Sequence, residues 1–308
     1  MTFSPPLVIG FGLGVGILVG MTGIGGGALL TPLLVLFVGA PPALAVGTDL
    51  AYGAVTKTVG ALKHWRQGTV DHALSAWMAL GSVPAAVGGV YVVGVLRRHL
   101  GGAFDAVLLY ILACAIGFTG AVTLVRAIFL RQLLARERDT VPMRTKHKAA
   151  AVALGLLVGF VLGITSAGSG SLIALGLILI FRLTPHRVVG TDIFHAAIVL
   201  WAGALAHAAA GNVDYALAGT ILVGSVPGVW AGSHMSIRLP AGTLRTVLGV
   251  VLIGAAMGLG SKAGFPIPPF AMAAVPVVLA LIVLGLRFHD KVSRADADTE
   301  AKEAAPKE

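Results

Sequence analysis

The chain has 308 residues, a net charge of +9 and a mean hydropathy of +0.93. Apolar residues make up 57% of it and charged residues only 11%, whereas a soluble domain carries roughly a quarter charged residues. This composition excludes a disordered chain and a collagen, and Cys114, the only cysteine, excludes a disulfide scaffold. It favours an all-α polytopic membrane protein.

Apolar stretches recur along most of the chain and predict membrane helices. In chain order they lie at about 7–21, 26–38, 45–62, 73–95 and 104–128, then at 149–165, 170–181, 190–209, 215–236 and 243–260, with a last one at 268–287. The range 7–38 is too long for one crossing of a ~30 Å hydrocarbon core and short for two. We therefore expect two half-length helices that meet at a break, and roughly eight to eleven segments in all.

The chain contains an internal repeat. Residues 20–89 align with residues 163–232 at a constant offset of 143 without a gap, and about 27 of the 70 positions are identical. The matches include the polar motif GTD at 47–49 and 190–192, and GSVP at 81–84 and 224–227. Apolar bias does not produce polar, glycine and proline matches at one offset, so the sequence predicts two halves of similar fold.

The repeat and the charges divide the chain into five parts. We expect a first membrane repeat at 1–128, a basic cytoplasmic linker at 129–148, a second membrane repeat at 149–261, an additional membrane helix at 262–288 and a disordered charged tail at 289–308.

The positive charges predict the orientation of the two repeats. If residue 1 faces outside, the loops outside hold only Arg97, Arg98 and Lys262, and most other Lys and Arg residues lie in inner loops, as the positive-inside rule requires. An odd number of crossings in each copy then makes the second repeat inverted. Since the basic residues lie beside membrane segments, the net charge does not indicate a nucleic-acid partner.

Both copies carry an interruption of small residues, at 20–27 and 163–171. Broken helices at matching places in two inverted halves point to a binding site near the membrane midplane. Helix N-termini near Gly27 and Ser171 would favour an anion there. The alternative is that the glycines only permit tight helix packing. The candidate binding residues are Thr22, Gly23, Gly25, Gly26, Gly27, Thr165, Ser166, Gly168, Ser169, Gly170 and Ser171.

The GTD acids are candidates for coupling. Asp49 and Asp192 could cap the apolar helices that follow them, or they could take a proton or contact substrate, because an acid in a membrane helix is usually functional. Lys57, inside an apolar segment, could attract an anion or extend to the nearby cytoplasmic edge.

The residues one turn beyond these acids, Tyr52 and His195, are further candidates for substrate binding, although a role in the core is the alternative. The spacing of His195 and His207 does not suit a metal site on one helix face.

Neither an enzyme nor a cofactor is expected. The serines near 166–171 lack the G-x-S-x-G pattern of a hydrolase, and the first copy keeps the architecture without them. The glycine run at 23–27 lacks the Lys-Ser/Thr of a phosphate-binding loop, so any active transport would be secondary.

These motifs resemble the TauE/SafE family of sulfite and organosulfonate exporters. The resemblance is carried by Gly23, Gly25–Gly27 and Pro32, by Pro42 with the GTD motif, and by the second copy at Gly168–Gly170 and Pro185–Asp192, and it covers about residues 8–260. It implies a multi-pass carrier of small sulfur-containing anions in the bacterial inner membrane.

The sequence therefore predicts a secondary transporter that exports sulfite or organosulfonates by alternating access around the two breaks, with a proton as a possible coupling ion. A passive anion channel would use the same glycines and charges, and a cation or metal transporter would use the acids as ligands. Small-residue faces such as 81–88 could also mate between subunits of a homo-oligomer.

Overall fold

The computed structural model describes residues 4–22, 27–129, 138–236, 241–283 and 285. Within these ranges the chain forms helices and one isolated β-bridge, between Arg138 and Leu183. Five helical stretches are long and apolar enough to cross a membrane, and the first of them covers both α4 and α5. The predicted all-α polytopic class is thus confirmed.

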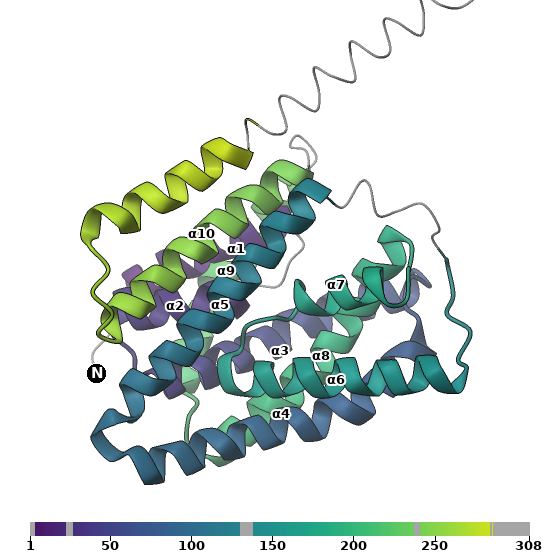
Figure 1. The fold of residues 1–308 in the computed structure, drawn as a ribbon, viewed down its shortest axis with the longest axis horizontal. Coiled ribbons are helices and arrows are strands. Elements are labelled where there is room, and N and C mark those ends of the chain that lie inside the picture. Colours follow the sequence, from purple (N-terminus) through teal and green to yellow (C-terminus); the bar gives the residue numbers. More distant parts are fainter. Residues whose placement is uncertain (1–3, 23–26, 130–137, 237–240, 284, 286–308) are drawn as a thin grey trace, which may run out of the picture.

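The helices follow the predicted segments in both copies. The first copy forms α1 (Pro5–Thr22), α2 (Gly27–Leu33) with the π-helical turn η1 (Leu34–Val38), α3 (Pro42–Arg66), α4 (His72–Leu100), the 3₁₀ turn η2 (Gly101–Ala103) and α5 (Phe104–Phe129). The second copy forms α6 (Thr145–Thr165), α7 (Leu172–Leu179), α8 (Pro185–Ala209), α9 (Tyr215–Ser236) and α10 (Ala241–Lys262). The additional helix, Pro269–Val283, packs outside α10, where a Cβ added to Gly254 would lie 3.4 Å from Pro276 (Figure 1). The predicted tail lies outside the described residues.

The same local signals begin and end the corresponding helices. Pro42 and Pro185 occupy the first turns of α3 and α8, where a missing N–H is tolerated. Both helices are followed by a glycine with positive φ, Gly68 at 66° and Gly211 at 70°, which turns the chain toward the next helix. These shared signals explain why helix boundaries are closely similar in the two copies.

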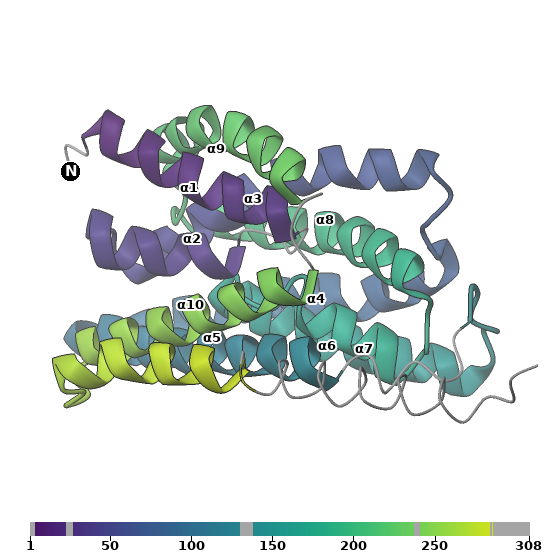
Figure 2. The same cartoon turned by 90° about the horizontal axis from the view of Figure 1, so that it is seen from above.

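Glycines bring helices of one repeat against helices of the other. α1 packs beside α9, and α4 packs beside α6 (Figures 1 and 2). A Cβ added to Gly12 would lie 2.5 Å from the carbonyl oxygen of Ile221, and the equivalent Cβ on Gly155 would lie 2.1 Å from that of Met78. Gly155 is the repeat equivalent of Gly12, and Ile221 is the repeat equivalent of Met78. The same two repeat positions therefore make both contacts, and the packing itself is duplicated.

Equivalent helices pack against each other in opposite directions. A Cβ added to Gly53 of α3 would meet Leu200 of α8, whereas one added to Gly60, further along α3, would meet Ile193, nearer the start of α8. The Trp201 indole N–H donates to the Thr58 hydroxyl at 2.9 Å, and these two positions are equivalent in the repeat. Contact between equivalent positions on antiparallel helices indicates a local two-fold axis between the halves. This geometry supports the predicted inversion, which stays a prediction for the membrane-embedded protein.

We expect Gly12→Leu to destabilise the bundle, because its side chain would separate α1 from the α9 backbone. Overpacking of this kind costs on the order of 1–3 kcal/mol, or a fall of several degrees in Tm. Gly14→Leu on the same helix is the matched control, since nothing lies within 4 Å of its Cβ position. Thermal unfolding in detergent measures both, and equal Tm values for the two variants would contradict the packing argument.

Candidate functional site

The second interruption is an irregular segment buried between α6 and α7. Its backbone leaves the helix at Ser166, which has a φ of 58°, and Gly168 and Gly170 follow with φ of 108° and 96°. A non-glycine residue in this left-handed region is uncommon and is found where surrounding structure holds it. Ser166, Ser169 and Ser171 are all buried. The predicted helix break is therefore present in the second repeat.

The first interruption falls largely outside the described residues. α1 ends at Thr22 and α2 begins at Gly27, while Gly23, Gly25 and Gly26 are not described. The predicted roles of these residues, and of the Thr22 side chain, stay predictions.

Asp49 of α3 accepts hydrogen bonds from residues of both repeats. Its Oδ2 atom accepts hydrogen bonds from the Thr31 backbone N–H at 3.2 Å, from the Thr31 hydroxyl at 2.6 Å and from the Ser166 hydroxyl at 3.0 Å. Its Oδ1 atom is buried without a partner. Thr31 belongs to the short helix α2 of the first repeat and Ser166 to the break of the second. Asp49 therefore links the half-helix of one repeat to the break of the other.

Asp192, the repeat equivalent of Asp49, contacts the far end of the same break. Its Oδ1 atom accepts the Gly170 backbone N–H at 3.2 Å. The equivalent of Thr31 is Ala174, so the hydroxyl that holds Asp49 is missing beside Asp192. The two acids thus hold opposite ends of one irregular segment.

The interpretation of these acids as caps of their own helices is wrong. α3 begins at Pro42 and α8 at Pro185, seven residues before each acid. The acids that do cap helices are Asp71 and Asp214, which precede α4 and α9 and whose carboxylates accept the N–H groups of Leu74 and Leu217. A GTD motif before an apolar run suggested a cap only because the preceding residues were not recognised as helical.

The first two residues of each GTD motif clamp the repeats together. The Thr48 hydroxyl accepts the Asp214 backbone N–H at 3.0 Å, and the Thr191 hydroxyl accepts that of Asp71 at 2.9 Å. A Cβ on Gly47 would lie 2.1 Å from the Asn212 carbonyl oxygen, so only glycine permits this approach. The glycine and threonine of each GTD motif therefore have structural roles, and the aspartate is the residue of the motif that contacts the helix break.

Positive charge is buried beside the break. Arg126 is 7% exposed, and its Nη1 donates to the carbonyl oxygens of Gly170 at 3.1 Å and Ser171 at 3.4 Å, while its Nε has no partner. Lys57 is also 7% exposed, and its ammonium has no partner. Both interact electrostatically with Asp192 but form no salt bridge with it, and Arg245 adds a third positive charge near Arg126. Lys57 therefore does not extend to the surface.

Tyr52 and His195 are buried next to the acids, but they face other helices. The Tyr52 hydroxyl lies near Ser225 of α9, and His195 lies near the Ser75 backbone of α4. Neither the hydroxyl nor the two ring nitrogens have a hydrogen-bond partner. The structure does not bring these two residues into the cluster around Gly170.

Sequence reasoning missed Thr31, Thr123 and Arg126. The Thr123 hydroxyl hydrogen-bonds the Ser171 hydroxyl at 2.9 Å, so α5 supplies two side chains to the start of α7. A charged residue inside the apolar stretch 104–128 was a signal for Arg126. The two threonines gave no sequence signal. Among the described residues, no three His, Cys, Asp or Glu side chains gather as metal ligands.

A helical bundle with several membrane-crossing helices and a buried, charged helix break has the architecture of a membrane transporter. Residues 8–260 match the family model described as sulfite exporter TauE/SafE. This chain belongs to that family.

Named relatives agree with this class. The chain is 40% identical to the probable membrane transporter protein YjnA of Bacillus subtilis (strain 168) over 250 residues, which cover 80% of this chain and 96% of the relative. It is 29% identical to the probable membrane transporter protein YdhB of the same organism, with coverages of 76% and 91%. A probable membrane transporter protein of Xylella fastidiosa (strain 9a5c) is 26% identical, with coverages of 83% and 95%. No significant match to a solved structure was found. The protein is a multi-pass membrane transporter of the bacterial plasma membrane.

We expect Thr48→Val and Thr191→Val each to lower stability by about 1 kcal/mol, because each removes one hydrogen bond between the repeats. The two bonds lie at opposite ends of the α3–α8 pair, so the losses should add in the double variant. Thr56→Val is the control, since its hydroxyl bonds only to the backbone of its own helix. Thermal unfolding measures all three variants. If Thr56→Val lowers the Tm as much as Thr48→Val and Thr191→Val do, these hydrogen bonds do not stabilise the contact between the repeats.

Proposed function

We propose that this protein exports small sulfur-containing anions, sulfite or organosulfonates, by secondary transport around the break between α6 and α7. The family description supports this substrate class. The first interruption, at 20–27, is expected from the repeat to contribute to the same site. The bound anion would lie among Lys57, Arg126 and the hydroxyls of the second break.

The observation that carries the proposal is the pair of buried cations without full partners. Charged side chains inside a membrane protein are costly and mark substrate pathways. Asp192 interacts with both Lys57 and Arg126, and its single negative charge balances only one of their two positive charges. An oxyanion would supply acceptor oxygens to the free Lys57 ammonium and the free Arg126 Nε. The cluster therefore favours an anion over a metal cation.

The two acids give the break a means of responding to binding. Ser166 is tied to Asp49 and Gly170 to Asp192, so a change at either acid would alter one end of the segment that faces the anion. In our proposal a proton on Asp49 couples transport to the proton gradient. The free Oδ1 atom is the position that this proton would occupy.

We expect Arg126→Gln and Lys57→Met each to reduce anion transport at least about tenfold, since a lost charge-assisted contact is worth more than about 1.4 kcal/mol. The measurement is flux of sulfite, taurine-derived sulfonates and sulfate into proteoliposomes. Arg98→Gln is the matched control, because this arginine is exposed at the end of α4. Wild-type flux in both Arg126 and Lys57 variants would sink the proposed site.

We expect Asp49→Asn to keep anion counterflow while losing accumulation driven by a proton gradient, because the amide keeps the shape but cannot exchange the coupling proton. Asp192→Asn, measured alongside, tests whether the coupling role belongs to Asp49 alone. If an imposed pH gradient leaves wild-type flux unchanged and counterflow is absent, the protein acts as a passive anion channel. The coupling proposal then fails.

A further inference from the structure

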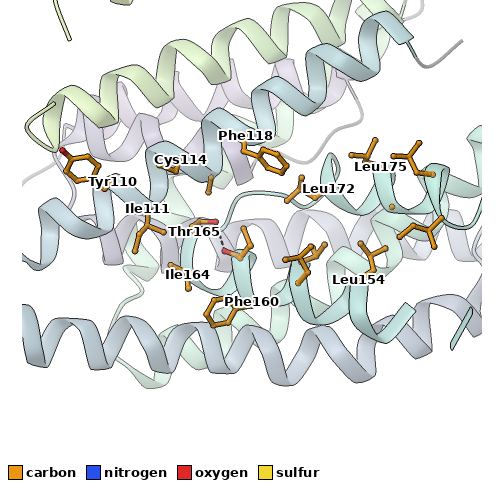
Figure 3. Close-up of a pocket in the computed structure, with 17 residues that line it drawn as sticks. Tyr110, Ile111, Cys114, Phe118, Leu154, Phe160, Ile164, Thr165, Leu172 and Leu175 are labelled. Carbon is orange, nitrogen blue, oxygen red and sulfur yellow. Dashed lines mark hydrogen bonds between the residues drawn. The ribbon is translucent and has the colours of Figure 1, made fainter. Parts of the chain in front are cut away.

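An apolar groove lies between α5, α6 and the half-length helix α7, and Thr165 and Leu172 at the two ends of the break are among its lining residues. Its volume is about 720 Å³, and its walls are nearly all hydrocarbon (Figure 3). Of the polar side chains in its wall, Thr165 donates its hydroxyl to the Val161 carbonyl oxygen of its own helix. The other polar groups among the lining side chains are the Tyr110 hydroxyl and the Cys114 thiol, so the groove favours an apolar ligand.

The groove opens sideways, where the bundle would meet the bilayer. Phe118 of α5 and Leu157 of α6 line it and are 60% and 63% exposed. It exists because α7, with its eight residues, reaches only about 12 Å, whereas a full crossing needs ~30 Å. The short helix leaves part of the wall between α5 and α6 uncovered.

Exposed arginines lie at one mouth of the groove. Leu179 and Ile180 line this end, and Arg182 follows two residues later. The Arg138 backbone N–H donates to the Arg182 carbonyl oxygen at 2.8 Å, which places the two exposed arginines side by side. The nearby acid, Asp139, is engaged by the Thr184 hydroxyl at 2.9 Å and by His186 at 3.7 Å. The mouth is thus positively charged, and it belongs to loops predicted to be cytoplasmic.

We propose that this groove binds an acyl chain of an anionic phospholipid from the cytoplasmic leaflet, with the headgroup phosphate at Arg138 and Arg182. The lining residues of α6 run from Leu154 to Thr165, about 16 Å of helix, which is close to half of a ~30 Å core. An acyl chain of one leaflet has this reach. Anionic lipids of the cytoplasmic leaflet are attracted to basic residues at its surface.

Because α7 forms part of the groove wall, a bound lipid would stabilise the position of this helix. Leu172 and Gly176 of this helix line the groove, while Ser171, one residue before its start, bonds Thr123. A bound chain would fill the lateral space beside α7 and hold the helix against α5 and α6. The lipid site itself does not depend on which solute the protein carries.

Native mass spectrometry of the full-length protein tests the proposal directly, with phosphatidylglycerol and phosphatidylcholine as probes. We expect the wild type to retain phosphatidylglycerol preferentially. Ala115→Trp, which fills the groove, should remove binding of both lipids at this site. Arg138→Gln with Arg182→Gln should weaken phosphatidylglycerol binding about tenfold or more and weaken phosphatidylcholine binding less, because the choline cation already opposes the arginines. This surface double variant keeps the core intact if Ala115→Trp does not fold.

Two controls match these variants. Leu80→Trp enlarges an exposed apolar side chain on α4, and Arg66→Gln removes an exposed charge at the end of α3. Both should bind lipid like the wild type. Equal retention of the two lipids by the wild type, or unchanged binding in the arginine double variant, would overturn the proposal. So would a dimer that dissociates in Ala115→Trp, which would assign the groove to a second copy of the chain.

Discussion

Direct contact between glycines and backbone carbonyl groups fixes the distances between the main helices of this bundle. At Gly155 and Gly12 the partner backbone occupies the space that a side chain would need. Water is not available inside a bilayer to drive helices together, so close packing of this kind is a main source of association. Because the contacts occur twice at the same offset, each repeat holds the other in place. The pair α3–α8, which carries both GTD motifs, is positioned between these duplicated contacts.

In each GTD motif the glycine and threonine stabilise the contact between the repeats, and the aspartate contacts the proposed substrate site. Gly47 and Thr48 bind the turn before α9, and the second copy binds the turn before α4 in the same way. The acids point elsewhere and reach opposite ends of the break in the second repeat. Each GTD motif thus connects the repeats next to the segment proposed to hold substrate. Movement of one repeat against the other would therefore change the conformation of the break.

The repeat, the helical segments and the second break could be predicted from the sequence, since they rest on apolar length, glycine content and a constant offset. The partners of the break could not. Thr31 and Thr123 are ordinary threonines in apolar stretches, and only the packing of α2 and α5 brings them to Asp49 and Ser171. The position of Asp49 in its helix was misjudged because Pro42 starts α3 two turns earlier than the polar motif suggested. Local signals predicted the order of elements, while contacts between helices that are far apart in the chain decided the site.

The hydrogen bond between Trp201 and Thr58 joins two positions that are the same position in the two copies. In a symmetric dimer of one repeat, such positions would hold identical residues, and every charge near the axis would be present twice. Lys57 lies one residue from this contact, and its equivalent in the other copy is Leu200. Joining the copies in one chain lets a single ammonium occupy a place where two would repel each other. The fused, diverged repeat can therefore surround an asymmetric substrate with asymmetric charge, which a pair of identical halves could not do.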